Sequence, residues 1–255
     1  SGMPDYHRAK HRVFRNVQQV VVNRQDALTQ PLVPDSVKQW TFGLDKADFR
    51  GFGVAVHQGA DWLYFQRESL LAVNEVAIKG RHNIANALSA LALGHAVDLP
   101  MAAMLTVLKR FRGLPHRCEN VAYINGVTWI NDSKATNVGA AVAAIDGLAG
   151  DRADIILLAG GQGKGQAFDE LGRAAAGKIK QAILFGEAAN QLAEQLAPHA
   201  PLIFVTTMEG AVGAAAQAAI AGDKVLLSPA CASFDMFKNY QHRGDVFAAA
   251  VRGLA

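Results

Sequence analysis

Three polar segments in the second half of the sequence carry side chains that could bind an anion or a nucleotide. In the first, Asn-Asp-Ser-Lys-Ala-Thr-Asn at residues 131–137, six of the seven side chains can form hydrogen bonds. Capping one helix would use one or two of them. The carboxylate of Asp132 could accept hydrogen bonds from ribose hydroxyls, and Lys134 could pair with a phosphate or a carboxylate. This surplus of polar groups indicates a binding site.

The second segment is Gly-Gly-Gln-Gly-Lys-Gly at residues 160–165. Its glycines would let backbone N–H groups approach a phosphate or a carboxylate, and Lys164 would add a positive charge. A tight turn with a solvated lysine explains the same residues equally well. The spacing is not that of a P-loop, whose Gly-x-x-x-x-Gly-Lys-Ser/Thr pattern does not occur in the 255 residues.

The third segment, residues 228–235, consists mostly of small residues that would leave room for a ligand. Ser233 could contribute to such a site, or it could only cap the helix that follows. Cys231 has no histidine near it in the sequence to act as its base, so we do not expect a cysteine nucleophile.

The first half of the sequence contains two further candidate segments. Asn83 and Asn86 are three residues apart, so both would lie on one face of a helix, where their amides suit the edge of an adenine base. We expect His82, at the start of this helix, to form structural hydrogen bonds. Residues 6–10 (Tyr-His-Arg-Ala-Lys) taken alone indicate a solvated basic face.

The elements that must position these segments fall into two regions. Gly113 and Pro115 interrupt the chain after a predicted helix and indicate a hinge between domains at residues 1–112 and 113–255. The elements predicted in the first domain are a strand at residues 20–22, a hairpin at 54–65, and helices at 82–96 and 101–111.

In the second domain, Asn125-Gly126 predicts a hairpin, after which strands alternate with Ala-rich helices. These later strands are predicted at residues 155–159, 182–185, 202–205 and 225–227. Such alternation implies right-handed βαβ crossovers and a mostly parallel sheet, so we expect a Rossmann-like α/β domain. Ligands bind at the carboxyl ends of strands in such sheets, and each of the three polar segments directly follows a predicted strand.

The composition is that of a globular protein, with 51% hydrophobic and 18% charged residues. A net charge of +3 is too small to indicate a nucleic-acid partner. No apolar run is long enough to span a membrane, and the N-terminus lacks the features of a signal peptide, so we expect a soluble cytoplasmic chain. Cys118 and Cys231 lie far apart in the sequence, and we expect both to be reduced thiols.

Five motifs, taken in order along the chain, resemble those of the Mur ligase family of peptidoglycan synthesis. They are Gly-x-His-Asn-x-x-Asn-Ala (80–87), Gly-Leu-Pro-His-Arg (113–117), Asn-Asp-Ser-Lys-Ala-Thr-Asn (131–137), Gly-Gly-x-Gly-Lys (160–164) and Leu-Leu-Ser-Pro-Ala-Cys-Ala-Ser-Phe-Asp (226–235). The resemblance implies an α/β chain that combines part of a central ATPase domain (residues 1–112) with a complete C-terminal Rossmann-like domain (residues 113–255).

The resemblance also implies a reaction. The last two motifs look like those of the members that add D-glutamate. ATP would phosphorylate the free carboxylate of UDP-N-acetylmuramoyl-L-alanine, and the amine of D-glutamate would attack the acyl phosphate. Mg²⁺ and cationic side chains would neutralise the charge that develops. The expected partners are therefore these two substrates, with ATP and Mg²⁺ as cofactors, and we expect a monomer with no nucleic-acid or membrane partner.

Individual residues receive roles from the same resemblance. Asn83 and Asn86 match positions that approach the adenine, and Asp132 matches the position that binds the ribose. Arg117 and Lys134 match positions near the phosphates and the reacting carboxylate. The residues that match the D-glutamate pocket are Thr136, Lys164, Ser233, Phe234 and Tyr240.

The spacing from Tyr6 to Lys10 matches a Tyr-x-x-x-Lys segment of the family whose lysine becomes carbamylated. The resulting carbamate anion helps to bind a second Mg²⁺. The resemblance therefore makes Lys10 a candidate catalytic and metal-site residue, where the charge pattern alone indicated only a solvated surface.

Several features of a whole Mur ligase are missing from the sequence. The P-loop, the magnesium-binding glutamate and a histidine upstream of Tyr6 are not found, and the start of the chain corresponds to the interior of the central domain. We therefore expect the chain to be inactive alone, and we interpret residues 1–3 as native sequence more readily than as a tag remnant. The alternative function is a non-catalytic α/β module that binds a dicarboxylate or a nucleotide. A Rossmann oxidoreductase is excluded, because no Gly-x-Gly-x-x-Gly follows a first strand.

Overall fold

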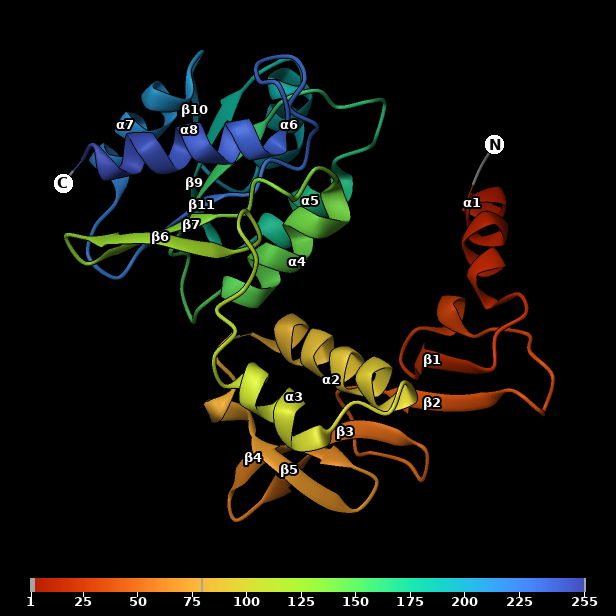
Figure 1. The fold of residues 1–255 in the computed structure, drawn as a ribbon. Helices are drawn as coiled ribbons and strands as arrows, with labels where there is room; N and C mark the ends of the chain where they lie inside the picture. Colours follow the sequence, from red (N-terminus) through yellow and green to blue (C-terminus); the bar gives the residue numbers. More distant parts are fainter. Residues whose placement is uncertain (1–2, 79, 255) are drawn as a thin grey trace. The chain divides into compact units, whose positions relative to one another are not determined.

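The computed structural model describes residues 3–78 and 80–254 of the chain. It forms two units, Ser1–Arg112 and Gly113–Ala255, each with a sheet and a hydrophobic core of its own (Figure 1). The interpretation of Ser1 and Gly2 as native sequence lies outside the described residues. No described helix is long and apolar enough to cross a membrane.

The first unit contains a five-stranded mixed sheet with the strand order β1-β2-β3-β4-β5. Its strands are β1 (Gln19–Asn23), β2 (Lys38–Phe42), β3 (Gly51–His57), β4 (Ala60–Phe65) and β5 (Glu68–Ala72). Strands β1, β2 and β3 are parallel, whereas β3, β4 and β5 form an antiparallel meander. The expected hairpin joins β3 to β4 through Gln58 and Gly59, both of which have positive φ angles.

Helix α2 covers the sheet of the first unit. The helical elements of this unit are α1 (Met3–Lys10), η1 (His11–Phe14), η2 (Ala27–Thr29), η3 (Val73–Glu75), α2 (Arg81–Ala96) and α3 (Met101–Leu108). Leu88 and Leu91 of α2 are buried in one core with Phe52 and Leu63 of the sheet. Leu93, on the opposite side of the same helix, is 55% exposed.

The second unit contains a six-stranded sheet with the order β10-β9-β8-β11-β7-β6. Its strands are β6 (Glu119–Ile124), β7 (Val127–Asn131), β8 (Ile155–Gly160), β9 (Ile179–Phe185), β10 (Leu202–Phe204) and β11 (Lys224–Leu227). Only β6, in the hairpin with β7, runs antiparallel to its neighbour. This arrangement confirms the mostly parallel α/β sheet that the sequence predicted.

Helices cover both faces of this second sheet. They are α4 (Val138–Leu148), α5 (Asp169–Ala175), α6 (Ala189–Leu196), α7 (Met208–Ala218) and α8 (Tyr240–Arg252). Side chains of β8 alternate between the two faces: Ile155 and Leu157 pack in the core with α4, α5 and α6, and Ile156 and Leu158 in the core with α7 and α8. Burial on both faces explains why this strand is a continuous apolar run.

Candidate functional site

The three polar segments of the second unit meet at one edge of its sheet. Strands β7, β8 and β11 are parallel neighbours, and Leu227, the last residue of β11, pairs with Asn131, the last residue of β7. The strands therefore end at the same edge. We call the segments that follow them, residues 132–137, 161–168 and 228–239, the strand-end loops.

Asp132 is a buried carboxylate at the start of the first strand-end loop, only 7% exposed. It accepts hydrogen bonds from the hydroxyl of Ser228 (2.8 Å) and the backbone N–H of Cys118 (3.1 Å). Burial raises the pKa of Asp132 to about 6, although these hydrogen bonds and the nearby charge of Arg117 oppose the rise. A carboxylate held in this way has oxygen lone pairs left to accept hydrogen bonds from a ligand.

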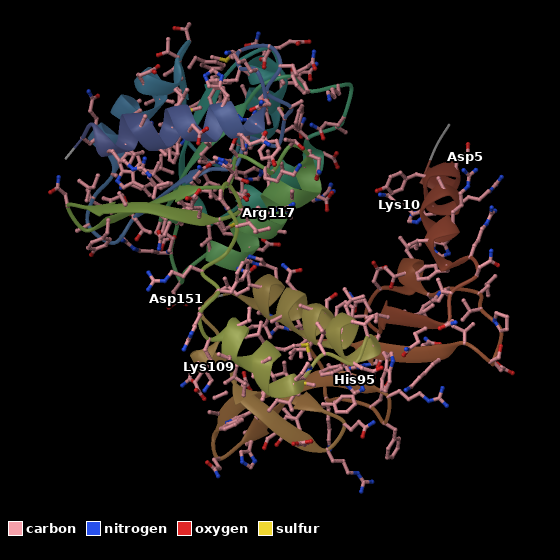
Figure 2. The ribbon with its side chains drawn as sticks, in the orientation of Figure 1. Asp5, Lys10, His95, Lys109, Arg117 and Asp151 are labelled. Carbon is pink, nitrogen blue, oxygen red and sulfur yellow. The ribbon has the colours of Figure 1, made fainter. Side chains whose placement is uncertain are left out.

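Lys134 lies beside Tyr240, the first residue of α8. Its Nζ is 4.2 Å from the centre of the tyrosine ring, and its backbone N–H donates to the carbonyl of His116 (3.0 Å). Arg117, the neighbour of His116, is exposed on the segment before β6 (Figure 2). The half-buried Thr136 follows in the same loop.

Lys164 and Phe234 form a second pair of a cation and an aromatic ring. The Nζ of Lys164 is 5.3 Å from the centre of the Phe234 ring, and Phe234 is 63% exposed. Ser233, next to Phe234, is buried. The structure thus brings Lys164 and Phe234, which are 70 positions apart in the sequence, into one small surface region.

Ser233 does not cap the following helix, contrary to the alternative that the sequence allowed. Helix α8 begins seven positions later, and the side chain of Asn239 accepts the hydrogen bond from the N–H of His242 (2.8 Å). The hydroxyl of Ser233 is therefore not occupied in helix capping, which leaves it compatible with the expected ligand-binding role.

Glycines 160 and 161 let the second strand-end loop pass close to its neighbours. Both have positive φ angles, and a Cβ on Gly160 would overlap the carbonyl oxygen of Phe185. Beyond them, Gln162 and Ala232 exchange two backbone hydrogen bonds (2.9 and 3.1 Å). The second and third strand-end loops are thus joined directly by backbone contacts.

Arg243 on α8 is a functional candidate that the sequence reasoning missed. It is fully buried, and its guanidinium donates to the carbonyl oxygens of Ser133 (2.9 Å) and Cys231 (3.1 Å) and to the hydroxyl of Ser133 (3.0 Å). A signal was present in the sequence: Arg243, Phe247 and Val251 are spaced by four, which places the arginine on the buried face of the helix.

Neither cysteine can act as a nucleophile in this environment. Both are free, and burial raises the pKa of Cys118 and that of Cys231 to about 12. Both thiols therefore stay protonated at neutral pH.

In the first unit, Asn83 and Asn86 lie in the first two turns of α2, with Asn86 exposed and Asn83 half-buried. Gly80 precedes the helix with a φ angle of 95° and provides no side-chain cap. Burial lowers the pKa of His82, so this imidazole is neutral at pH 7, as a structural histidine would be.

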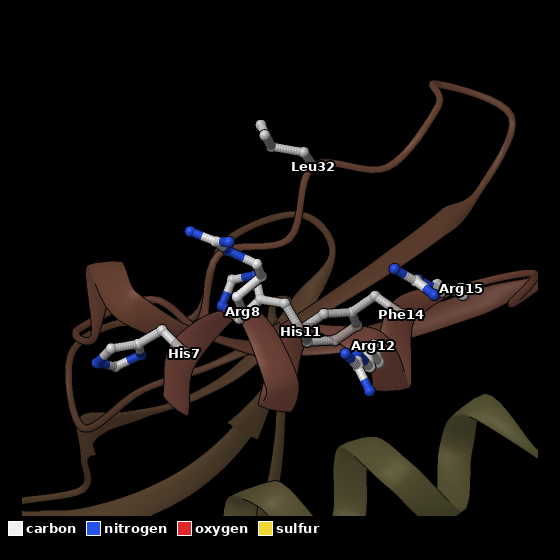
Figure 3. A pocket seen from close by; sticks show the side chains of 7 residues that line it. All are labelled: His7, Arg8, His11, Arg12, Phe14, Arg15 and Leu32. Atoms are coloured by element: carbon white, nitrogen blue, oxygen red, sulfur yellow. The ribbon is translucent and has the colours of Figure 1, made fainter. Parts of the chain in front are cut away.

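Lys10 is exposed at the end of α1, and its Nζ is 5.3 Å from the centre of the Tyr6 ring. Next to it, an open cavity of about 410 Å³ is lined mainly by basic side chains (Figure 3). The lining residues are His7, Arg8, His11, Arg12, Phe14, Arg15 and Leu32. Within residues 3–78 and 80–254, no group of three His, Cys, Asp or Glu side chains could hold a metal ion. Since Mg²⁺ requires oxygen ligands, the described residues around Lys10 do not fit this ion by themselves.

Comparisons with known proteins agree along the whole chain. Residues 1–94 match the Mur ligase middle domain, and residues 116–231 match the domain described as "Mur ligase, glutamate ligase domain". The chain is 54% identical over 255 residues to the UDP-N-acetylmuramoylalanine--D-glutamate ligase of Pseudomonas aeruginosa. The alignment covers 100% of this chain and 57% of that protein. The chain thus spans little more than half the length of the curated relatives that it matches.

Solved structures share the fold at low sequence identity. A pseudomurein peptide ligase type C from Methanothermus fervidus has a TM-score of 0.74 at 14% identity, covering 100% of this chain and 60% of that one. The UDP-N-acetylmuramate-alanine ligase of Thermotoga maritima has a TM-score of 0.69 at 14% identity, covering 100% of this chain and 56% of that one. These two likenesses concern the fold alone.

Proposed function

The chain belongs to the Mur ligase family, and from this premise we propose that it supplies the D-glutamate site and part of the ATP site of a ligase that joins D-glutamate to UDP-N-acetylmuramoyl-L-alanine. The observation that carries the proposal is the meeting of three strand-end loops at one edge of the second sheet. Each loop contributes a cation or a hydroxyl at a position that the family resemblance assigns to a substrate.

The D-glutamate site would be formed by the second unit. A dicarboxylate needs a cation, which Lys164 would supply from its position beside the ring of Phe234. Lys134, beside the ring of Tyr240, would lie near the phosphates and the reacting carboxylate, as the resemblance implies. Hydroxyls of Thr136 and Ser233 would complete the hydrogen bonds to the ligand. The remaining contacts would come from the rings of Phe234 and Tyr240.

The family resemblance assigns ATP contacts to residues of the second unit and, separately, to residues of the first unit. Asp132 would accept hydrogen bonds from the ribose, because its carboxylate is held in place by Ser228 and the N–H of Cys118. Asn83 and Asn86 would bind the adenine. Arg117, exposed and close enough to Asp132 to lower its pKa, would approach the phosphates.

The proposed chemistry proceeds through an acyl phosphate. The γ-phosphoryl group of ATP would be transferred to the free carboxylate of UDP-N-acetylmuramoyl-L-alanine, with release of ADP. The amine of D-glutamate would then displace phosphate and form the amide. Mg²⁺ would supply charge neutralisation when bound. Carbamylation of Lys10, which the resemblance implies, would add the kind of oxygen ligand that the described residues around it lack. The ligation reaction would take place in the cytoplasm, and the chain would act as a monomer.

Binding measurements on two variants, each expected to weaken the binding of one ligand only, test the proposal. Isothermal titration calorimetry of the chain with D-glutamate and with ATP should give two separable effects. Lys164→Met should weaken D-glutamate binding about tenfold or more while leaving ATP binding unchanged, because one charge-assisted hydrogen bond is lost. Asp132→Asn should weaken ATP binding and leave D-glutamate binding unchanged.

Arg173→Met provides the matched control, since Arg173 is an exposed cation of the same unit whose ion pair, among the described residues, is with Asp169 on its own helix. If Lys164→Met and Arg173→Met behave alike toward D-glutamate, the proposed site is wrong. The separate expectation that the chain is inactive alone is tested by ADP release: turnover that depends on D-glutamate would contradict it.

A further inference from the structure

The guanidinium of Arg243 connects the first and third strand-end loops with the last residue of β8, which leads into the second loop. In addition to the carbonyls of Ser133 and Cys231, Nη1 donates to the carbonyl of Ala232 (3.3 Å) and, at 3.5 Å, to that of Gly160. The hydroxyl of Ser133 accepts from Nε and itself donates to the carbonyl of Tyr240 (2.8 Å). One side chain thus fixes the ends of β7 and β8 and the loop after β11 relative to α8.

Burying this cation is unfavourable for stability in itself. Arg243 is 0% exposed, and no salt bridge joins it to a carboxylate anywhere in residues 3–78 and 80–254. Burial lowers its pKa to about 10, so it remains charged at neutral pH. An apolar side chain of similar length would avoid the desolvation cost. An apolar side chain could not hold backbone carbonyls from two loops and from the end of β8 at one point.

Arg243 makes no hydrogen bond to Asp132 itself, although it bonds the next residue, Ser133. Asp132 is held by Ser228 and the N–H of Cys118, and none of its hydrogen bonds involves Arg243. In contrast, the residues bonded to Arg243 immediately precede Lys134 and Ser233, and Gly160 begins the turn that leads to Lys164.

We propose that Arg243 is a positioning residue for the D-glutamate side of the site and does not position the ribose-binding side. The inference rests on the proposed function only for the identity of the ligand. The claim that Arg243 holds the first loop, the third loop and the end of β8 together rests on its hydrogen bonds alone. These two parts can therefore fail separately.

The experiment combines hydrogen exchange with calorimetry on the whole chain. Arg243→Met removes the charge and the donors, and Arg243→Lys keeps the charge but cannot reach all the carbonyls. In both variants, backbone amides of residues 133–136, 161–165 and 231–235 should exchange about tenfold faster or more, because loops held by one group are released together. D-glutamate affinity should fall about tenfold, and ATP affinity should stay within about twofold.

Lys224→Met is the matched control. Lys224 begins β11 and forms an ion pair with the buried Asp154 (2.5 Å). Its loss therefore destabilises the second unit at the end of β11 that lies away from the third strand-end loop. This variant should lower the melting temperature without selective exchange in the three loops and without a change in the ratio of D-glutamate to ATP affinity. A merely structural role for Arg243 would give the same pattern as Lys224→Met.

Each outcome decides one part of the inference. If Arg243→Met does not fold, Arg243→Lys supplies the test. Loops that exchange at the wild-type rate in Arg243→Lys overturn the positioning role, as does an equal loss of ATP and D-glutamate affinity. If the loops loosen together but the wild-type chain does not bind D-glutamate, the positioning role stands and the proposed ligand is wrong.

Discussion

Replacing Asp132 by Asn should stabilise the second unit at pH 7 while weakening nucleotide binding. Burial raises the pKa of Asp132 from its ordinary value of 3.8 to about 6. At pH values between 3.8 and about 6, the carboxyl group of Asp132 is mostly protonated in the folded state and mostly ionised in the unfolded state. Stability contributed by the protonated carboxyl is therefore lost as the pH rises from about 4 through about 6, and the loss amounts to about 3 kcal/mol.

Asparagine preserves the shape and both hydrogen bonds of this site. Its side-chain oxygen can accept from the N–H of Cys118, and its amide can donate to the hydroxyl of Ser228. The free-energy difference between Asp132→Asn and the wild-type chain should accordingly grow from near zero at pH 4 to about 3 kcal/mol at pH 7. A carboxylate that lowers stability to this extent is best explained by a role in binding a ligand.

Urea unfolding between pH 4 and 8, followed by tryptophan fluorescence, measures this difference. Trp129 is buried in the core of the second unit and reports on that unit once Trp40 and Trp62 are replaced by Phe. Asp151→Asn supplies the control, because it makes the same chemical change at an exposed position of the same unit (Figure 2). A difference between Asp132→Asn and wild type that stays constant across this range, or that shrinks as the pH rises, would refute the reasoning.

Two further predictions concern stability and use thermal unfolding as the measurement. Gly160→Ala should lower the free energy of unfolding by about 3 kcal/mol or more, because its φ angle of 145° and the adjacent backbone exclude a side chain. Gly165→Ala should lower it by about 1 kcal/mol, because Gly165 has a φ angle of 71° and open space around it. Lys180→Met should lower the free energy of unfolding by about 1 to 2 kcal/mol, because it removes the nearer (2.5 Å) of two cations that pair with the fully buried Asp223 carboxylate, while Arg152 remains at 3.4 Å. The exposed Arg173→Met should change stability by less than about 0.5 kcal/mol. Equal effects within either pair would contradict the corresponding explanation.

Local patterns in the sequence were sufficient to predict much of the second unit. Asn125 and Gly126 have the positive φ angles of a tight hairpin turn, and few other residue pairs adopt them at so little cost. The apolar run of β8 is continuous because the strand is buried on both faces. Once the strands and their parallel order were predicted, the general rule for α/β sheets placed the polar segments at one edge.

The contacts that complete the candidate site could not be predicted in this way. Arg243 reaches Ser133 across 110 positions of sequence, and its role depends on where two loops and the end of β8 direct their carbonyl groups. The cap of α8 was also missed, because Ser233 and Asn239 are both suitable capping residues and only the path of the loop decides between them. The parallel pairing of β1 with β2 depends likewise on tertiary packing.

The central claim, that the strand-end loops bind D-glutamate, is tested most directly by titrating the ¹⁵N-labelled chain with D-glutamate and, separately, with L-glutamate while recording amide NMR spectra. D-glutamate should shift the resonances of residues 131–136, 160–165 and 231–235 in a saturable manner and leave α2 unaffected, and L-glutamate should bind about tenfold more weakly or worse. Absence of saturable shifts in these loops, or equal affinity for the two enantiomers, would contradict the claim.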